Sequence, residues 1–369
     1  MQTQRLIVDP GALAAPAAIA ALERAAGVLR AGGLVALPTE TVYGLGANAL
    51  DAAAVARIFA AKQRPSWDPV IVHLAPLQRL EAMLEGLAES IPPAAHRLIE
   101  AFWPGPLTLL LPRTRAVPDA VTAGRPLVGV RMPAHPVAIE LIRRAAVPVA
   151  APSANLFGHI SPTTADHVLA DLGGRIDVIV DAGPTGYGVE STVLDPCQSP
   201  MVIYRPGAVT ADQIRAVAGA VEAFRESAAP AETPREALPA PGVGIRHYAP
   251  RARLILVEGP AAELAERLAE CAAEEHREQV GIMLPGDLGG ALELARYRVF
   301  AWGRWAVPAE LARDLYAGLR ALDAEGCTAI LCPLPPEEGI GAAIRDRLRK
   351  AAGGREARNS AAGAQGNES

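Results

Sequence analysis

Residues 34–49 read LVALPTETVYGLGANA, and this stretch is the key to the fold. The apolar residues that open it predict a strand, and two hydroxyl side chains, Thr39 and Thr41, stand where that strand ends. Two glycines, Gly44 and Gly46, follow closely. Hydroxyls and glycines at a strand end suit either a turn or a ligand site. The pattern of this stretch alone leaves that choice open.

Helices and strands are expected to alternate on either side of it. A 3.6-residue apolar pattern predicts a helix over residues 17–30. A second helix, capped by Asp51, is expected to end just before Lys62 and Arg64. Not every pair of strands has a helix between it, so we predict an α/β fold with a twisted open mixed sheet and flanking helices. Further strands are expected at 70–74, 107–113, 127–133, 148–152, 176–183, 191–195 and 201–207.

The composition changes in the last third of the chain. Residues 1–218 are expected to form the larger, catalytic domain, and 219–250 are rich in Pro, Ala and Glu, as in an extended linker. Residues 251–352 repeat the strand-then-helix rhythm of a smaller Rossmann-like domain, without a Gly-x-Gly-x-x-Gly motif after the first strand. The tail at 353–369 is poor in apolar residues and is expected to be disordered.

Charge and composition narrow the possible functions. The formal net charge of −5 argues against a protein whose whole surface binds nucleic acid. No apolar run is long enough to cross a bilayer and no secretory pattern opens the chain, so we expect a cytoplasmic protein without a membrane partner. The four cysteines are scattered, which predicts neither a disulfide framework nor a structural metal site.

Several polar side chains stand at the ends of expected strands and helices. Lys62 and Arg64 offer two cations that suit a polyphosphate, although for this pair alone a solvated helix end is the more ordinary explanation. Ser153 and Asn155 follow an apolar strand directly and are hard to explain as helix caps. Ser161 is explained as well by a turn. Such strand-end positions are where α/β folds usually bind ligands.

Four further candidates lie on the expected strands or beside them. Arg131 stands inside an apolar strand, so its charge needs either a protein carboxylate or an anionic ligand. His73, taken alone, is more often a hydrogen-bonded core residue than a catalyst. Ser191 follows a Gly-rich loop, and Arg205 closes another strand. Cations and hydroxyls with few acid-base residues favour nucleotide and amino-acid binding over hydrolysis.

The order of motifs adds a specific resemblance. Between residues 38 and 250 the chain carries, in this order, the motifs PTETVYGLG, KQRP followed by VIVH, WPGPLTLLL, VRMPAHP, APSAN, GVEST, YRPG and HYAP. The chain thereby resembles the threonylcarbamoyl-AMP synthase family, the YrdC-like proteins, in its long two-domain form. The resemblance covers the chain to about residue 350.

The resemblance implies an activity. Such an enzyme combines L-threonine, bicarbonate or CO2 and ATP into L-threonylcarbamoyladenylate and releases pyrophosphate. A carbamate oxygen would attack the α-phosphorus, without a covalent enzyme intermediate, and Mg2+ is the expected metal. A partner enzyme would then modify the adenosine beside the anticodon of tRNAs that read codons starting with A, so that contact with tRNA is indirect.

The resemblance also assigns site residues. Lys62 and Arg64 are the implied catalytic pair. The implied ATP-binding residues are Lys62, Arg64, Ser153, Asn155, Ser161, Arg205 and Tyr248. Tyr248 comes from the linker at 219–250, which in two-domain members of the family can lie over the active site. The implied threonine-binding residues are Thr39, Thr41, His73, Arg131 and Ser191. Gly44 and Gly46 are expected to let the backbone turn away from the cleft, and Tyr43 to pack in the core; no metal ligands are assigned.

One departure and two alternatives remain. Asp68 stands where the family more often has Asn, so it either repels the triphosphate or helps to bind Mg2+. An RNA-binding module without chemistry is disfavoured by the acidic charge and the lack of aromatic platforms. A carbamoyl-adenylate-forming domain of the hydrogenase-maturation type is disfavoured because its acylphosphatase and zinc-finger regions are missing from the sequence.

Overall fold

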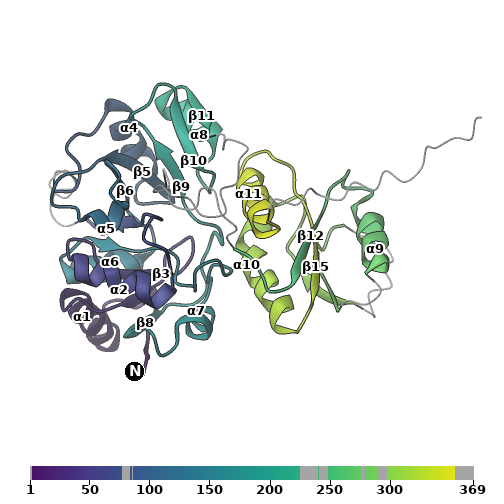
Figure 1. Cartoon of the computed structure of the whole chain (residues 1–369), viewed down its shortest axis with the longest axis horizontal. Coiled ribbons are helices and arrows are strands. Elements are labelled where there is room, and N and C mark those ends of the chain that lie inside the picture. Colours follow the sequence, from purple (N-terminus) through teal and green to yellow (C-terminus); the bar gives the residue numbers. More distant parts are fainter. Residues whose placement is uncertain are drawn as a thin grey trace, which may run out of the picture. The chain divides into compact units, whose positions relative to one another are not determined.

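The chain divides into two units, Met1–Ile245 and Arg246–Ser369. The structure is a computed structural model, and it describes residues 2–76, 84, 86–224, 240, 248–275, 279–288 and 297–353. Both units are built of strands and helices (Figure 1). In the described ranges, no helix is both long and apolar enough to span a bilayer.

The N-terminal unit is built on an eleven-stranded sheet in the order β1-β8-β2-β3-β7-β4-β6-β5-β9-β10-β11. Parallel pairs such as β1 with β8 occur beside antiparallel pairs such as β2 with β3. The predicted mixed sheet is thus confirmed. Its strands are β1 (Gln4–Ile7), β2 (Val35–Leu37), β3 (Gly44–Asn48), β4 (Ile71–His73), β5 (Leu107–Pro112), β6 (Leu127–Arg131), β7 (Val149–Ala150), β8 (Val178–Asp181), β9 (Thr192–Asp195), β10 (Met201–Arg205) and β11 (Val221–Ala223). The helices described here are α1 (Pro16–Arg30), α2 (Ala52–Lys62), α4 (Pro93–Phe102), α5 (Asp119–Thr122), α6 (Pro136–Ala145), α7 (Ala165–Leu172) and α8 (Ala211–Ala218).

Both faces of this sheet are covered, and β2 illustrates how. Val35 and Leu37 join a core with residues of α1 and α6. Ala36, between them, joins a second core with residues of α2 and α4. Successive side chains of a strand point to opposite faces. A strand that is apolar without a break therefore indicates a sheet buried on both sides.

Helix α2 brings the predicted cations to the site. The Asp51 carboxylate accepts hydrogen bonds from the backbone N of Ala53 at 2.9 Å and of Ala54 at 3.2 Å, as a helix N-cap does. At the other end Gln63 takes a left-handed conformation with φ 53°. The helix therefore ends at Lys62, and the expected position of this helix is confirmed.

The predicted site residues do not all lie at the same end of the strands of the sheet. Ser153, just past β7, bridges Gly44. His73, the last residue of β4, instead pairs with Val149, the first residue of β7. Because β7 has only two residues, and a strand rises about 3.3 Å per residue, the two ends of β7 lie close together.

The two glycines of the opening stretch do not turn the backbone away, because both lie in β3. A Cβ on Gly46 would lie 2.7 Å from Val149 Cγ1 and 2.9 Å from Leu37 Cδ2. These glycines instead let β3 approach its neighbours closely. Tyr43, just before them, is fully buried in the core, as expected.

The C-terminal unit contains a four-stranded sheet in the order β12-β15-β13-β14, and all of its pairs are parallel. This agrees with the predicted smaller Rossmann-like domain. Residues of α9 and of strands β12, β13 and β15 form its own core. The elements described are β12 (Arg253–Val257), α9 (Leu264–Glu274), β13 (Val280–Leu284), β14 (Arg298–Ala301), α10 (Pro308–Ala324), β15 (Ala329–Pro333) and α11 (Gly341–Ala351).

The N-terminal unit extends past the expected boundary at residue 218. Strand β11 pairs with β10 beyond that point. Ala240, within the expected linker, is buried in a core cluster with Ile71, Leu110 and Val193 of the sheet. Linker residues 225–239 and 241–247 and tail residues 354–369 lie outside the described residues. The expectations of a linker over the site and of a disordered tail therefore stay predictions.

Candidate functional site

The turn between β2 and β3 is held by its own threonines. Thr39 Oγ1 accepts hydrogen bonds from the backbone N of Thr41 at 3.2 Å and of Val42 at 3.3 Å, and it donates to Val42 O at 2.6 Å. Thr39 Oγ1 also lies 2.8 Å from Thr41 Oγ1. Both threonines are buried. Thr39 therefore stabilises the turn. The Thr41 hydroxyl also contacts Arg131, another predicted site residue.

Arg131 ends β6 and is 3% exposed. Its Nε donates to Gly105 O at 3.2 Å and its Nη1 donates to Thr41 Oγ1 at 3.0 Å. Its Nη2 lies 2.6 Å from Glu40 Oε1, an ion pair without the alignment of a hydrogen bond. Of the two partners left open for this charge, the protein supplies a carboxylate. Sequence reasoning missed Glu40, since a glutamate in a turn is ordinarily solvated.

His73 lies beside Arg131 because β4 and β6 are parallel and these two residues are paired in register. The imidazole is 3% exposed, and its Nδ1 lies 3.3 Å from Ile71 O. Burial, and then the charge of Arg131, lower the pKa of His73 to about 3. The ring is therefore neutral at physiological pH and offers hydrogen bonds rather than charge.

Lys62 is enclosed at the end of α2, with 1% of its surface exposed. Its Nζ donates to the backbone O of Ser153 and of Asn155, both at 2.5 Å. Burial, and then the nearby Arg64, hold the pKa of the Lys62 ammonium well below its usual value. Asn155 Nδ2 donates to two backbone carbonyls at 2.8 Å, whereas Asn155 Oδ1 is buried and has no hydrogen-bond partner among the described residues. Lys62 is thus no solvated helix end, and it meets the predicted Ser-x-Asn segment directly.

Arg64 is held by the segment that follows it. Its Nη2 lies 2.8 Å from Asp68 Oδ1 and donates to Pro69 O at 2.8 Å. The Asp68 side chain is fully buried. Burial raises the pKa of the Asp68 carboxyl, while the charges of Arg64, Lys62 and Arg205 oppose that rise. The charges of Lys62, Arg64 and Arg205 therefore all act on this one carboxylate, and Arg64 contacts it directly.

Ser191 and Arg205 form a further buried contact. Arg205 donates to Ser191 twice at 3.1 Å, from Nη2 to Oγ and from Nε to the backbone O. Ser191 Oγ also lies 2.8 Å from Thr108 Oγ1. Only glycine fits at Gly207, because a Cβ there would lie 2.3 Å from Thr192 N. Thr108 was missed by sequence reasoning because the apolar strand around it indicates core.

Ser161 is fully buried, and its Oγ donates to Glu190 Oε1 at 2.5 Å. Glu190 is also buried, at 6% exposed. A charge-assisted hydrogen bond of this kind is stronger than one between neutral groups. Ser161 is therefore fixed by the segment that carries Ser191, and Glu190 is another site residue that the sequence reasoning did not select.

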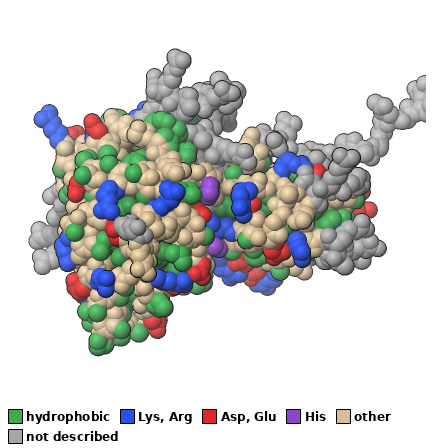
Figure 2. Space-filling view, turned by 60° about the horizontal axis from the view of Figure 1, so that its bottom comes forward, with side chains coloured by type: hydrophobic (Ala, Val, Ile, Leu, Met, Phe, Trp, Pro, Cys, Tyr) green, Lys and Arg blue, Asp and Glu red, His purple; other side chains and the backbone are tan. Residues whose placement is uncertain are grey.

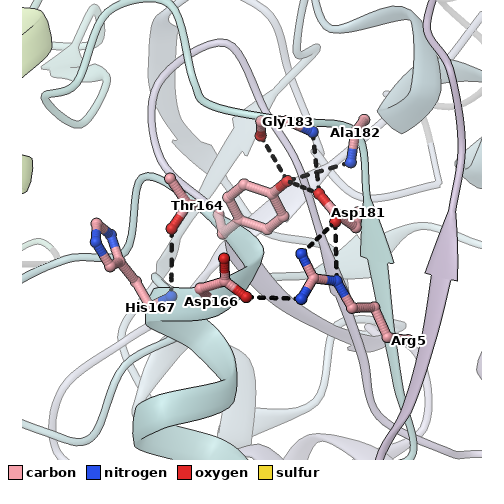
Figure 3. Close-up of polar contacts among 8 residues, drawn as sticks. Arg5, Thr164, Asp166, His167, Asp181, Ala182 and Gly183 are labelled. Atoms are coloured by element: carbon pink, nitrogen blue, oxygen red, sulfur yellow. Dashed lines mark hydrogen bonds and ion pairs between the residues drawn. The ribbon is translucent and has the colours of Figure 1, made fainter.

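A network of hydrogen bonds and ion pairs holds the β2–β3 turn to neighbouring elements (Figure 3). The Tyr43 hydroxyl donates to Gly183 O at 2.7 Å and accepts from Ala182 N at 3.2 Å. Burial raises the pKa of Tyr43, so the hydroxyl keeps its proton. Beside it, Arg5 Nη2 lies 2.6 Å from Asp181 Oδ2, and Arg5 Nη1 lies 2.6 Å from Asp166 Oδ1. The turn is thereby tied to β1, β8 and α7.

Tyr248 belongs to the C-terminal unit. Its ring stacks on Tyr316 with a centroid separation of 5.8 Å, and the Arg347 guanidinium lies 5.3 Å from its centroid. Tyr248 is 5% exposed. These contacts all lie within one unit, so the assignment of Tyr248 to ATP stays a prediction.

The carboxylates of the site already have partners, as the contacts of Glu40, Asp68 and Glu190 show. Within the described ranges, no group of three or more His, Cys, Asp or Glu is placed to hold a metal ion. Mg2+ in nucleotide sites is held largely by substrate phosphates and water.

Charges are mixed on the visible surface of the N-terminal unit. On the face in Figure 2, blue basic side chains stand among red acidic ones and uncharged surface. Electrostatic binding of nucleic acid depends on basic groups gathered on one face. This face of the described unit has no such pattern.

Comparison with known proteins gives matches over most of the chain. The family model described as "Telomere recombination" matches residues 27–207, and the one described as "Threonylcarbamoyl-AMP synthase, C-terminal domain" matches 209–353. The threonylcarbamoyl-AMP synthase of Pyrococcus abyssi is 45% identical over 331 residues, covering 89% of this chain and 93% of that protein. That of Bacillus subtilis is 44% identical over 335 residues, covering 90% and 93%. The solved structure of P. abyssi Sua5 with L-threonine superposes with a TM-score of 0.85 at 42% identity, covering 96% of this chain and 98% of that one.

Proposed function

The chain belongs to the threonylcarbamoyl-AMP synthase family, and from this premise we propose that it joins L-threonine, bicarbonate or CO2 and ATP into threonylcarbamoyl-AMP and pyrophosphate. The observations that carry the proposal are the buried Asp68, which Arg64 contacts and on which the charges of Lys62 and Arg205 also act, and the buried Arg131. Three cations whose charges act on the same carboxylate suit a triphosphate, and a buried arginine suits a carboxylate. The similar Sua5 structure contains L-threonine.

On the ATP side, the cations have distinct roles. Lys62 supplies a compact charge, whereas Arg64 and Arg205 supply forked donors for phosphate oxygens. Asn155 Oδ1, which is buried and has no hydrogen-bond partner in the described part of the chain, supplies an acceptor for a base or ribose donor. The residues proposed to bind ATP are Lys62, Arg64, Ser153, Asn155, Ser161, Arg205 and Tyr248, of which Lys62 and Arg64 act in catalysis.

On the amino-acid side, Arg131 is proposed to bind the carboxylate of threonine. The neutral His73 beside it hydrogen-bonds without competing for that charge. The hydroxyls of Thr41 and Ser191 already contact arginines and complete the polar lining. The residues proposed to bind threonine are Thr39, Thr41, His73, Arg131 and Ser191.

The proposed chemistry needs alignment and charge neutralisation. The threonine amine forms an N–C bond with CO2 to give a carbamate and releases a proton. A carbamate oxygen then bonds to the α-phosphorus as the P–O bond to pyrophosphate breaks. Lys62, Arg64 and Arg205 offset the charge that develops on the phosphates. Mg2+ bound with ATP would supply further positive charge at the phosphates, and no side chain forms a covalent intermediate.

The product class and partners follow from this chemistry. Transfer of an adenylyl group to a carbamate oxygen makes the protein a nucleotidyltransferase. The mixed anhydride formed is an activated carbamoyl donor, so a second enzyme would transfer it to the adenosine beside the anticodon of tRNAs that read codons starting with A. We propose that the protein meets this partner in the cytoplasm and contacts tRNA only through it.

Threonine-dependent release of pyrophosphate tests the proposal. The protein is incubated with ATP, Mg2+ and bicarbonate, with and without L-threonine. We expect release only with threonine, and a loss of about 100-fold or more in kcat/KM for Lys62→Ala and Arg64→Ala. Arg57→Ala is the control, because Arg57 lies on the same helix with its side chain 45% exposed. Release independent of threonine, or unchanged rates in both variants, would contradict the assignment.

A further inference from the structure

Glu40 is a buried carboxylate with unused hydrogen-bonding capacity. It is 9% exposed, and neither of its oxygens accepts a hydrogen bond from the described residues. Its contact is the ion pair with Arg131, at 2.6 Å. Buried carboxylates usually accept hydrogen bonds, and leaving them without donors is costly. The two Glu40 oxygens are therefore suited to donors that a ligand brings.

The charges of Arg131 and Glu40 cancel each other, and the neighbouring His135 adds no charge to the pair. His135 also influences Glu40, but burial lowers the pKa of His135, and its Nδ1 accepts a hydrogen bond from Val137 N at 3.2 Å. A ring that accepts at Nδ1 carries no charge there. Among the described residues, the positive charge that faces Glu40 at ion-pair distance is thus that of Arg131.

This pairing restricts what Arg131 can bind. A ligand carboxylate that engages Arg131 draws its charge away from Glu40. Glu40 would then be left as a buried carboxylate without a compensating cation, which is strongly unfavourable. The cost is removed if the same ligand carries a cation next to its carboxylate. The α-ammonium of an amino acid, attached to the carbon that bears the carboxylate, meets this condition.

We propose that Glu40 binds the α-ammonium group of the substrate while Arg131 binds its carboxylate, so that the pair selects a zwitterion. This inference rests on the proposed function, in which Arg131 receives the carboxylate of threonine. Glu40 then acts as a substrate-binding residue of the same site. A hydroxy acid without the amine would engage Arg131 but leave Glu40 unpaired, and the site rejects it.

Binding of two ligands that differ only in the amine tests the inference. L-Threonine and 3-hydroxybutanoate share the carboxylate and the hydroxyl, and their affinities are measured by calorimetry or competition. The wild-type protein should prefer threonine strongly. Glu40→Gln keeps the shape but removes the charge, and should weaken threonine about 10- to 100-fold while leaving 3-hydroxybutanoate unchanged or tighter, because an interaction with a charged group is lost only for the amine.

Two controls keep the result interpretable. Glu23→Gln, on α1 with a side chain 51% exposed, should change neither affinity. If Glu40→Gln fails to fold, Glu40→Asp withdraws the carboxylate by one methylene and should weaken threonine selectively. Equal weakening of both ligands would mean that Glu40 only positions Arg131, and would overturn the inference alone, as would no change in either. A wild-type protein that binds no threonine would overturn the proposed function and the inference together.

Discussion

Asp68 places a buried negative charge among the cations proposed to hold the triphosphate. The sequence left two roles open for it, repulsion of the triphosphate or help in binding Mg2+. The ion pair with Arg64 at 2.8 Å supports the first, because it partly neutralises a phosphate-binding group. We expect Asp68→Asn to lower the KM for ATP about three- to tenfold through the lost repulsion, with the KM for threonine unchanged. A higher KM for ATP together with a higher Mg2+ requirement would instead assign Asp68 to the metal.

His73 should make stability depend on pH. Its pKa is lowered from 6.5 to about 3 by burial and by Arg131, so below pH 6.5 the unfolded chain binds a proton that the folded chain does not. The contribution of His73 is complete above pH 6.5 and is lost as the pH falls towards 3. At pH 5 the loss is about 2 kcal/mol. Denaturant unfolding at pH 7 and pH 5 should show this loss in the wild type and a smaller one in His73→Gln. Equal losses would contradict the lowered pKa.

The site residues differ in how far sequence could reveal them. Lys62 and Asn155 were selected as parts of separate motifs, and the contact of Lys62 with the backbone of Asn155 needs the fold that joins α2 to the segment after β7. The need of Arg131 for a partner followed from its apolar strand. That this partner is Glu40 could not be predicted. The sequence of the turn, with Glu40 between Thr39 and Thr41, does not show which of these side chains points inward.

At the scale of elements, the segment before β9 depends on a close backbone approach. A Cβ on Gly207 would lie 2.3 Å from Thr192 N and 2.6 Å from Glu190 O, and both atoms belong to backbone that cannot yield cheaply. Gly207→Ala should therefore lower the free energy of unfolding by about 1–3 kcal/mol and reduce threonine binding by displacing Ser191. Chemical denaturation and calorimetry measure the two effects.

Gly27→Ala is the matched control for Gly207→Ala. Gly27 lies inside α1, and an added Cβ would approach no nearer than 3.8 Å to Arg30 Nη2. Alanine inside a helix is favoured over glycine by about 1 kcal/mol. Gly27→Ala should leave binding unchanged and slightly raise the free energy of unfolding. If Gly207→Ala is as harmless as Gly27→Ala, the close approach does not constrain the site.

Local signals predicted most elements but not their neighbours in space. Asp51 marked the start of α2, and apolar runs marked the central strands, because caps and periodicity are local. The antiparallel pairing of β4 with β7 is decided by tertiary packing, which no run of residues reveals. Short strands such as β3 and β11 also escaped, since three to five residues with glycines or charges give a weak strand signal.

At the scale of the whole molecule, the two units should be separable. The N-terminal unit, Met1–Ile245, has its own cores, and the C-terminal unit has another. A fragment of residues 1–245 should unfold cooperatively and bind threonine as the full chain does, because every proposed threonine contact lies within it. It should bind ATP more weakly, since Tyr248 is absent. Melting curves and calorimetry test this, and a fragment without a cooperative transition would contradict independent folding.

A shorter fragment tests how much the contact of Ala240 stabilises the N-terminal unit. It is buried against Ile71, Leu110 and Val193, so a fragment ending at residue 224 loses that contact. This shorter fragment should melt a few degrees below the longer one, by roughly the amount expected for a small loss of buried apolar surface. Identical melting temperatures would show that the contact of Ala240 adds no stability.

The most direct measurement of the central claim is the mass of the product formed with 13C-labelled bicarbonate. The protein is incubated with ATP, Mg2+, L-threonine and either labelled or unlabelled bicarbonate, and the nucleotides are analysed at once by mass spectrometry. We expect an adenylate that contains both threonine and one carbon from bicarbonate, formed by the wild type and not by Lys62→Ala. An adenylate of threonine without the added carbon, or no threonine-containing nucleotide at all, would contradict it.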